Sequence, residues 1–380
     1  MGKNLIEIPH HYGRKLFRSA AEVTSGVPFK LSFDAEKLVG HLETENDNVL
    51  TYSVYHSIKR DPNYLHWLAT SIKNLSEKGQ IIEIGCNNGE LLDLLDNGNY
   101  SIIGIDPTIH STSKSKHITL RKDFWNKEFV SKNKEYLFPD VIVARHVLEH
   151  IPNYDDFMID IGTVAKDSTH LIIEVPDFQV NLKSNDVTPI FSEHIHYFTL
   201  PGLQKIMNKH GWYINNFHRN SYWGGTLILF LSRNGEVHNF NETASLIREA
   251  AINFQTGLDR NNKCIIAELT DRRQALGKGV AMLGIGNRAL HLLAILPKDL
   301  PVDYYLDNDP TKKDMIIPYQ LGKIDTFAVE YLSKIHTLFI TAFGYERQLI
   351  SQIKNQIKLA RDFQIVLCDP QFRSVSLYDL

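Results

Sequence analysis

Cysteine is scarce in this sequence. The chain of 380 residues contains three, Cys86, Cys264 and Cys368, which lie far apart. Their odd number and their spacing exclude a disulfide framework and a zinc site made mainly of cysteine. So few cysteines are typical of a protein of the cytoplasm, which is the location that we expect.

Signals for membranes and for nucleic acid are also missing. No run of about 18 apolar residues occurs, so no segment is predicted to span a bilayer. The N-terminal Met-Gly-Lys-Asn-Leu-Ile lacks the hydroxyl residue that a myristoylation signal has at its sixth position, and no leader-like apolar segment follows. The 41 Lys and Arg nearly balance the 44 Asp and Glu, and a net charge of −3 creates no overall field for nucleic acid or an anionic membrane. We therefore expect neither as a partner.

The composition provides enough apolar surface for more than one core. Hydrophobic residues make up 43% and charged residues 22%, the balance of a soluble folded protein. A length of 380 residues suits two or three domains of about 100 to 200 residues each. We divide the chain into an N-terminal lobe over 1–60, an α/β domain over 61–238, a helical connector over 239–276 and a second α/β domain over 277–380.

The first 50 residues have no clear period and predict an irregular lobe or a partly ordered arm. From about Gln80, strands and helical stretches alternate. The strand-like segments read QIIEIG, SIIGID, HITL, DVIVAR and HLIIEV, and TLILFLS is suited to close the same sheet. This alternation predicts a parallel sheet with helices on both faces.

A long amphipathic helix is predicted between 242 and 273. Apolar residues recur there at three- to four-residue spacing, at Ile247, Ala250, Phe254 and Leu258. The segments GVAMLGIGNRA, VDYYLDND, HTLFITAFG and FQIVLCDP then repeat the alternation of strand and helix. The predicted fold class is α/β, with a central Rossmann-like sheet, a second Rossmann-like domain at the C-terminal end and a small N-terminal lobe.

The most informative stretch is IIEIGCNNGELLDLL, followed by SIIGIDPT. A buried strand brings Glu83 and Gly85 to a glycine-containing turn, and a helix begins after Gly89. Glycine allows the backbone to turn sharply and a ligand to approach it closely. Asp106 ends the next strand about 20 residues later, where a carboxylate can accept the ribose hydroxyls of an adenosine.

This spacing resembles the E/D-x-G-x-x-x-G motif of class I S-adenosylmethionine-dependent methyltransferases more closely than the dinucleotide G-x-G-x-x-G form. DVIVARHVLEHI is similar to the fourth-strand segment that borders the adenine and the methyl donor in that family, and Asp123-Phe124 to its adenine-contacting pair. The resemblance covers about residues 60–235. It implies S-adenosyl-L-methionine as cofactor, bound by Glu83, Gly85, Cys86, Asn87, Gly89, Asp106, Pro107, Asp123, Phe124, Arg145 and His146.

A second segment, IFSEHIHYFTLPGLQKIMNKHGW, resembles a narrower group, the C-methyltransferases of nucleotide-linked deoxysugars. These carry a Y-H-E-H-x-x-Y-F segment, a Gly-Gly-Ser/Thr strand and a C-terminal Rossmann-like domain. The matching residues are Glu193, His194, Tyr197, Phe198 and Trp223-Gly224-Gly225-Thr226. Upstream, LTYSVYHSIKR resembles the family's aromatic segment, which implies that Tyr52 or Tyr55 faces the site.

The resemblance implies catalytic roles for a small set of side chains. His194 would be the base, oriented by Glu193, with Tyr55 and Tyr197 as hydrogen-bond donors, and His146 would lie at the cofactor edge. Two departures are visible: Phe191 and Ser192 replace the first Tyr-His of the family segment, and no cysteine precedes Cys86, whereas the family's lobe holds a four-cysteine zinc site. Either the lobe is built without metal or the substrate differs.

The paired histidines offer alternatives. His146 and His150 are four residues apart and would both reach a zinc ion if that turn were helical. His194 and His196 are two apart, so they would share a face in a strand. Neither pair comes with a third and a fourth ligand at typical spacing, and we predict no metal.

The second domain carries the pattern Gly284-x-Gly286-x-x-Ala289, with Asp307 ending a strand about 20 residues later. This pattern is typical of NAD-binding domains. The resembling methyltransferases instead use the domain as a wall for the substrate, and Lys312 and Arg288 could contact a nucleotide diphosphate there.

The sequence thus predicts a methyl transfer from S-adenosylmethionine to a small-molecule acceptor. Carbon beside a ketone of a nucleotide-linked sugar, or of a related metabolite, is the expected target. The alternatives are an O- or N-methyltransferase, in which His194 or His146 deprotonates a hydroxyl, and a non-catalytic module that binds S-adenosylmethionine or a nucleotide.

Overall fold

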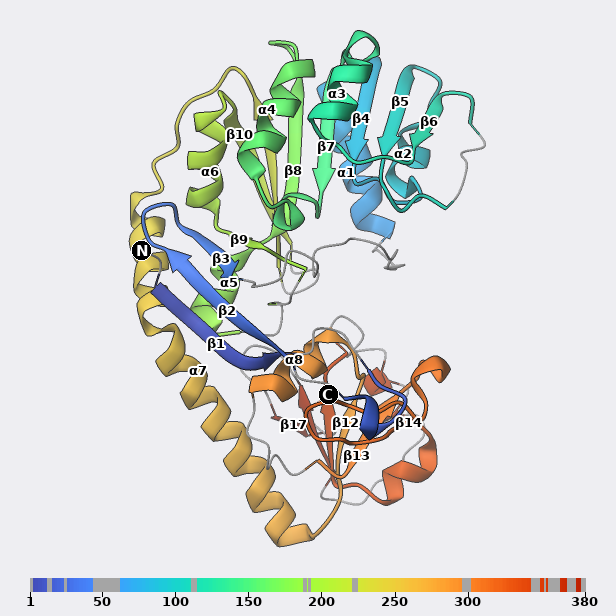
Figure 1. The fold of residues 1–380 in the computed structure, drawn as a ribbon, viewed down its shortest axis with the longest axis vertical. Coiled ribbons are helices and arrows are strands. Elements are labelled where there is room, and N and C mark those ends of the chain that lie inside the picture. Colours follow the sequence, from blue (N-terminus) through green and yellow to red (C-terminus); the bar gives the residue numbers. More distant parts are fainter. Residues whose placement is uncertain are drawn as a thin grey trace.

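The computed structural model describes residues 3–11, 16–23, 26–43, 62–110, 115–186, 190, 193–220, 225–295, 302–342, 349–351, 353–354, 363–367 and 374–376. These residues form three sheets. Figure 1 shows the largest sheet at one end of the molecule and the C-terminal sheet at the other, with the N-terminal sheet between them.

The central sheet has the strand order β10-β11-β8-β7-β4-β5-β6. Its strands are β4 (Gly79–Ile84), β5 (Tyr100–Ile105), β6 (Ile118–Arg121), β7 (Val141–Arg145), β8 (His170–Pro176), β10 (Tyr213–Asn220) and β11 (Thr226–Ser232). β4 to β8 run parallel, whereas β11 is antiparallel to both of its neighbours. The order reverses between β4 and β7, and ligands of open α/β sheets bind at the carboxyl ends of the strands at such a point.

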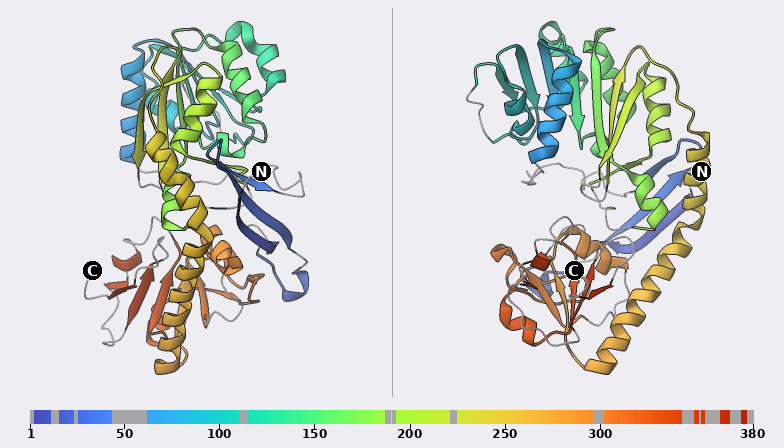
Figure 2. Two further views of the ribbon diagram at one scale, coloured as in Figure 1. Left: turned by 90° about the vertical axis from the view of Figure 1, so that its left-hand side faces the viewer. Right: turned by 180° about the vertical axis from the view of Figure 1, so that it is seen from behind.

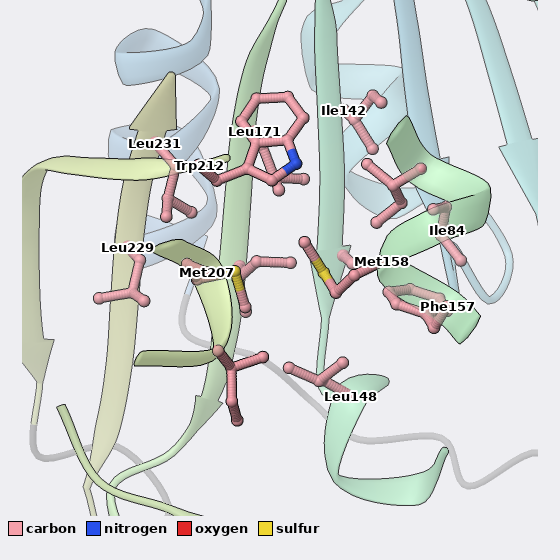
Figure 3. Close-up of a cluster of buried hydrophobic side chains, with 14 of the residues drawn as sticks. Ile84, Ile142, Leu148, Phe157, Met158, Leu171, Met207, Trp212, Leu229 and Leu231 are labelled. Atoms are coloured by element: carbon pink, nitrogen blue, oxygen red, sulfur yellow. The ribbon is translucent and has the colours of Figure 1, made fainter. Parts of the chain in front are cut away.

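Helices cover both faces of this sheet. They are α1 (Pro62–Leu75), α2 (Glu90–Leu95), α3 (Lys127–Asn133), α4 (Tyr154–Val164) and α6 (Leu200–Lys209), with 3₁₀ turns η3 (Lys134–Tyr136) and η4 (Leu148–His150). Helix α5 (Phe178–Ser184) belongs to a separate core. Residues of α1 and α2 pack on one face, and residues of α3, α4 and α6 pack on the other. Figure 3 shows the second of these cores, with Trp212, Met207 and Met158 between the helices and the sheet.

The N-terminal lobe is an antiparallel sheet, not an irregular arm. It consists of β1 (Lys3–His11), β2 (Val27–Asp34), β3 (Val39–Glu43) and β9 (His196–Phe198), in that order, with a 3₁₀ turn η1 (Ala20–Glu22) between the first two. β9 comes from the middle of the chain, and its register pairs Gly40 with Tyr197 and His41 with His196. The expectation of irregular structure was wrong because the sheet is completed by a strand about 150 residues away, which no local pattern reveals.

Helix α7 (Asn241–Leu276) connects the two α/β parts. Ile247, Phe254 and Leu258 are buried along its inner side, where they pack with apolar residues of β1, β2 and α5. Figure 2 shows α7 running beside the N-terminal sheet from one α/β part to the other. Within the described residues, no helix is both long and apolar enough to cross a bilayer.

The C-terminal sheet has the order β14-β13-β12-β15-β16-β17, and only β17 is antiparallel to its neighbour. Its elements are β12 (Val280–Leu283), α8 (Asn287–Ile295), β13 (Tyr304–Asp307), η6 (Pro310–Lys312), β14 (Ile324–Thr326), η7 (Val329–Ser333), β15 (Thr337–Ile340), β16 (Gln364–Leu367) and β17 (Ser374–Ser376). An antiparallel bridge between Phe17 and Ile316 ties the N-terminal segment to this domain. The predicted fold class, two Rossmann-like α/β sheets and an N-terminal lobe, is confirmed.

Candidate functional site

The glycine turn lies at the carboxyl end of β4. Gly85, Asn87 and Gly89 all have positive φ angles, of 74°, 51° and 85°. A Cβ atom added to Gly85 would come within 2.2 Å of Val147 Cγ2, on the segment after β7. The chain therefore requires glycine at position 85, because this is the only way for the turn to pass so close to its neighbour.

Asp106 fixes the turn to the end of β5. Its carboxylate is 3% exposed; Oδ2 accepts a hydrogen bond from Asn87 N at 3.0 Å, and Oδ1 accepts from the backbone N and the hydroxyl of Thr108 at 2.7 and 2.6 Å. Each carboxylate oxygen can accept more than one bond. The turn and this acid lie where the ribose of an adenosine is held in similar folds, so these residues fit S-adenosylmethionine.

The other predicted cofactor residues surround this turn. Asp123 and Phe124 follow β6 and are exposed, and Asp123 Oδ1 accepts a hydrogen bond from Phe124 N at 2.8 Å. Pro107 is half-buried. Cys86 is buried in the core between α1, α2 and the sheet, and burial raises the pKa of its thiol. Cys86 can therefore meet a ligand through its backbone but not as a thiolate.

Glu83 and Arg145 contact each other across β4 and β7. Arg145 Nε and Nη2 donate to Glu83 Oε1 at 2.9 and 2.6 Å, and both side chains are buried. Burial lowers the pKa of Arg145, but the charges of Glu83 and Glu174 outweigh it and raise the pKa overall. The two residues thus form an ion pair beneath the turn, in addition to any contact with a cofactor.

His146 lies between two carboxylates. Its Nδ1 is 3.1 Å from Glu149 Oε1 and its Nε2 is 3.3 Å from Glu174 Oε1, while the hydroxyl of Tyr64 donates to Glu174 Oε2. Burial disfavours the charged imidazole, but Glu174 and the two hydrogen bonds raise the pKa of His146 to about 9. The pKa of Glu174 falls to about 2 against the effect of burial, chiefly through His146. At neutral pH His146 is a cation with both nitrogens engaged, so it is poorly suited to act as a base.

His194 lies beside one of these two carboxylates, that of Glu149. His194 Nε2 is 3.9 Å from Glu149 Oε1, and the ring of His194 packs edge-on against those of His150 and Tyr197, at centroid distances of 4.8 and 6.1 Å. The backbone reinforces this contact, because Ile195 N donates to Glu149 O at 2.8 Å. Sequence reasoning passed over Glu149, which directly precedes His150 in VLEHI.

Glu193 and Tyr197 flank the candidate base. The backbone O of Glu193 accepts a hydrogen bond of 2.7 Å from His150 Nδ1, which fixes the segment before β9. Tyr197 is buried, and its ring packs on Phe178 at 5.1 Å. Several predicted residues lie outside the described part of the chain, namely Tyr52, Tyr55, Phe191, Ser192, Trp223 and Gly224.

Only His196 of the pair His194 and His196 lies in a strand, because β9 begins at His196. His196 instead packs on His41, with their Nδ1 atoms 3.5 Å apart, and its Nε2 lies 3.2 Å from Pro152 O. Burial lowers the pKa of His196 to about 4 and also lowers the pKa of His41. The turn that carries His146 and His150 is not α-helical, because His146 has a φ of 52° and precedes the 3₁₀ turn η4.

One group of residues has the donor types of a metal site. The ligand-capable atoms of Glu149, His150 and His194 all lie within 4.8 Å of one another. A divalent cation there would compete with the charged His146 for Glu149. The structure thus places a third donor, Glu149, beside two of the histidines, and the absence of metal stays a prediction.

The glycine pattern of the C-terminal domain contains an internal ion pair. Lys312 Nζ donates to Asp307 Oδ2 at 2.8 Å and to the backbone O of Ile285 at 3.0 Å. In NAD-binding domains the equivalent carboxylate accepts ribose hydroxyls. Here Lys312 pairs with this carboxylate, that of Asp307, which argues against NAD binding. The side chain of Arg288 lies outside the described part of the chain.

Comparisons with known proteins agree with the central sheet. Residues 56–215 match a protein family described as a methyltransferase domain. The chain is similar to the C-methyltransferase NovU of Streptomyces niveus, with 23% identity over 159 residues, which is 41% of this chain and 38% of that protein. The similarity therefore spans well under half of the curated relative.

Solved structures are similar to just under half of the chain. A 1,6-didemethyltoxoflavin-N1-methyltransferase of Burkholderia thailandensis matches with 11% identity and a TM-score of 0.36, covering 48% of this chain and 94% of that one. The magnesium protoporphyrin IX methyltransferase of Synechocystis PCC 6803 matches with 14% identity and a TM-score of 0.35, covering 47% and 91%.

Proposed function

We propose that this protein, whose residues 56–215 form a class I S-adenosylmethionine-dependent methyltransferase domain, methylates a carbon atom beside a ketone in a small molecule. The observation that carries the proposal is His194, a buried imidazole next to the carboxylate of Glu149. Both residues belong to segments at the edge of the sheet where the glycine turn lies. The printed activity of the Streptomyces relative, a C-methyltransferase, supports the same reaction.

The chemistry requires a base because a carbon beside a ketone is not nucleophilic until it loses a proton. His194 would take this proton, leaving the electron pair as an enolate. Tyr197, and Tyr55 from the segment upstream, would donate hydrogen bonds to the enolate oxygen. When bound, S-adenosylmethionine supplies an electrophilic methyl group on a sulfonium. The protein's remaining task is to hold donor and acceptor in line.

The acceptor that we propose is a nucleotide-linked keto sugar. Support comes from the segment Glu193 to Phe198, which resembles that of the deoxysugar C-methyltransferases, and from the C-terminal Rossmann-like domain. O- or N-methylation is the second candidate. Phe191 and Ser192 favour it, since Phe191 replaces a tyrosine of the resembling family and lacks its hydroxyl, and Ser192 replaces a histidine and lacks its imidazole.

Exchange of the acceptor's α hydrogen with solvent tests this function. Wild-type protein is saturated with S-adenosylhomocysteine, which has no methyl group to transfer, and mixed in deuterated water with a panel of nucleotide-linked keto deoxysugars. We expect deuterium beside the ketone, at a rate that falls roughly 10² to 10⁴-fold in His194→Ala. His66→Ala, on the exposed side of α1, is the matched control.

Calorimetry with the same variants separates chemistry from binding. Cofactor affinity should be unchanged in His194→Ala, because the loss concerns proton transfer only. If no acceptor exchanges, or if His194→Ala exchanges as fast as the wild type, carbon methylation with this base is refuted and the O- or N-methyl alternative takes its place.

A further inference from the structure

A cavity lies on the central sheet away from the candidate base. It has a volume of about 220 Å³ and is lined by residues of β4, β5, β6, α3 and η3. Figure 1 shows β5 and β6 at the outer end of the sheet, and β10 forms the opposite edge. None of the residues predicted to be catalytic or to bind the cofactor lines this cavity. It is therefore separate from the candidate active site.

The polar wall of the cavity comes from the two outer strands. It consists of Ser101 of β5 and of Thr119 and Arg121 of β6, which lie two residues apart and so share a face of the strand. Within the described part of the chain, none of these three side chains makes a hydrogen bond or an ion pair. The wall thus offers two hydroxyls and a guanidinium to a ligand that carries negatively charged oxygen atoms.

The apolar wall of the cavity is held in place by the neighbouring strand β4. Phe129 and Leu137 line it and are buried, whereas Tyr136, which also lines it, is 72% exposed. The side chain of Gln80 fixes this wall, because its Nε2 donates to Tyr136 O at 3.0 Å and its Oε1 accepts from Phe138 N at 2.6 Å. Aromatic rings pack on one another edge-on or offset, so this wall suits a ligand with a ring.

Arg121 also connects the cavity with the cofactor site. Its backbone O accepts one hydrogen bond from Asp106 N at 3.0 Å and another from Asp123 N at 3.0 Å. Asp106 is the residue expected at the ribose, and Asp123 is expected at the adenine. A ligand bound to the guanidinium restrains the same residue whose backbone holds both of these acids. The cofactor then meets a site that is already ordered and loses less conformational entropy when it binds.

We propose that this cavity is an effector site for a small aromatic carboxylate, whose binding increases the affinity for S-adenosylmethionine. The carboxylate accepts hydrogen bonds from Arg121 and from the hydroxyls of Ser101 and Thr119, and the ring packs on the apolar wall. The volume is smaller than the roughly 300 to 1,000 Å³ of common ligand pockets, so the ligand has about one ring. The proposal concerns the methyltransferase domain and its cofactor and does not depend on which atom of the acceptor is methylated.

Calorimetry with benzoate, a carboxylate with one ring, tests the binding. At equal concentration, the wild-type protein should bind benzoate better than benzamide, which has the same shape without the charge, and better than acetate, which has the charge without the ring. Arg121→Met should weaken benzoate binding roughly 10 to 100-fold, the usual effect of losing hydrogen bonds to a charged group. Lys122→Met is the matched control, since it removes an exposed cation that does not line the cavity. Tyr136→Ala, also at an exposed position, should weaken benzoate binding by loss of the ring contact.

The effect on the cofactor site is measured with S-adenosylhomocysteine. Its affinity should rise at least about 5-fold at saturating benzoate, and benzoate should gain the same factor in protein saturated with S-adenosylhomocysteine, because such coupling is reciprocal. In Arg121→Met, benzoate should no longer change this affinity. Without benzoate the variant should bind S-adenosylhomocysteine as the wild type does, which shows that it is folded.

Several results would overturn the proposal. Equal binding of benzoate and benzamide would exclude Arg121 as the partner of the carboxylate. Competition between benzoate and S-adenosylhomocysteine would place benzoate in the cofactor site instead. Benzoate that does not bind, or that binds and leaves the affinity for S-adenosylhomocysteine unchanged, would exclude an effector site of this kind. None of these results affects the α-hydrogen exchange, so the proposed function is tested separately.

Discussion

The buried ion pair between Glu83 and Arg145 should be one of the main stabilising contacts of the central sheet. Both side chains are almost fully buried, and two hydrogen bonds of 2.9 and 2.6 Å join them. Removing one partner leaves the other charge buried without compensation. Glu83→Gln should therefore lower the free energy of unfolding by about 3 to 5 kcal/mol.

The structure provides an exposed ion pair for comparison. Lys132 Nζ lies 2.6 Å from Glu128 Oε1, a similar distance, but the side chains are 69% and 74% exposed. Glu128→Gln should leave the free energy of unfolding almost unchanged, since solvent screens such pairs. The two pairs share a glutamate and the same shortest distance, whereas they differ in burial, in the cation and in the number of hydrogen bonds.

Urea unfolding followed by the fluorescence of Trp212, which is buried in the same domain, measures both variants. The double variant Glu83→Met/Arg145→Met should lose less stability than the sum of the two single changes, because it leaves neither charge unpaired. Equal costs for Glu83→Gln and Glu128→Gln would refute the reasoning. A variant that is fully stable yet binds no cofactor would show that Glu83 serves as a ligand contact only.

Four further predictions follow from other contacts. Asp106→Ala should weaken S-adenosylmethionine binding by about 1 to 3 kcal/mol in calorimetry, and an unchanged affinity would remove Asp106 from the cofactor site. Gly85→Ala should abolish cofactor binding, because its Cβ would lie 2.2 Å from Val147 Cγ2. Gly286→Ala is the control, since its Cβ would meet nothing within 4 Å, and it should bind the cofactor normally. Equal affinities of the two variants would contradict the role of the glycine turn in cofactor binding. The pKa of His196 is about 4 in the folded protein and about 6.5 in the unfolded chain. The free energy of unfolding should therefore fall by up to about 3 kcal/mol as the pH drops from 6.5 to 4. In His196→Asn, acid unfolding curves should show a smaller dependence of stability on pH. Elemental analysis of protein purified without a histidine tag should find no stoichiometric zinc. Stoichiometric zinc would instead identify Glu149, with His150 and His194, as a metal site.

The fold of the α/β parts was predictable because its signals are local. β4, β7 and β8 are short apolar runs that are each followed by a helix, and the glycine turn marks the end of β4. The N-terminal sheet has no such signal. Its last strand, His196–Phe198, is three residues long and pairs with β3 across about 150 residues of chain, so its membership depends on tertiary packing.

The residues of the candidate site also include some that the sequence predicts and some that it does not. Gly85 and Asp106 were recognisable because their backbone requirements fix both residue type and spacing. Side-chain pairing across the sheet was not recognisable: Glu83 and Arg145 were both expected at the cofactor, and no sequence pattern indicates that they contact each other. Glu149 was not predicted because the histidines on either side of it, His146 and His150, suggested a metal site. The structure places its carboxylate between the imidazoles of His146 and His194.

The N-terminal lobe shows how the segment of His194 can be held without the cysteines of the resembling family. Phe29, Leu31 and Phe33 of β2 are buried against Phe178 of α5 and Phe254 of α7. Each such side chain contributes roughly 1.5 to 3 kcal/mol when fully buried. This core is therefore large enough to anchor the sheet, and β9, as its last strand, ties residues 196–198 to it. Since His194 lies two residues before β9, an apolar core can position the candidate base as a metal-stabilised lobe would. The absence of early cysteines is thus compatible with the proposed reaction and does not by itself require a different substrate.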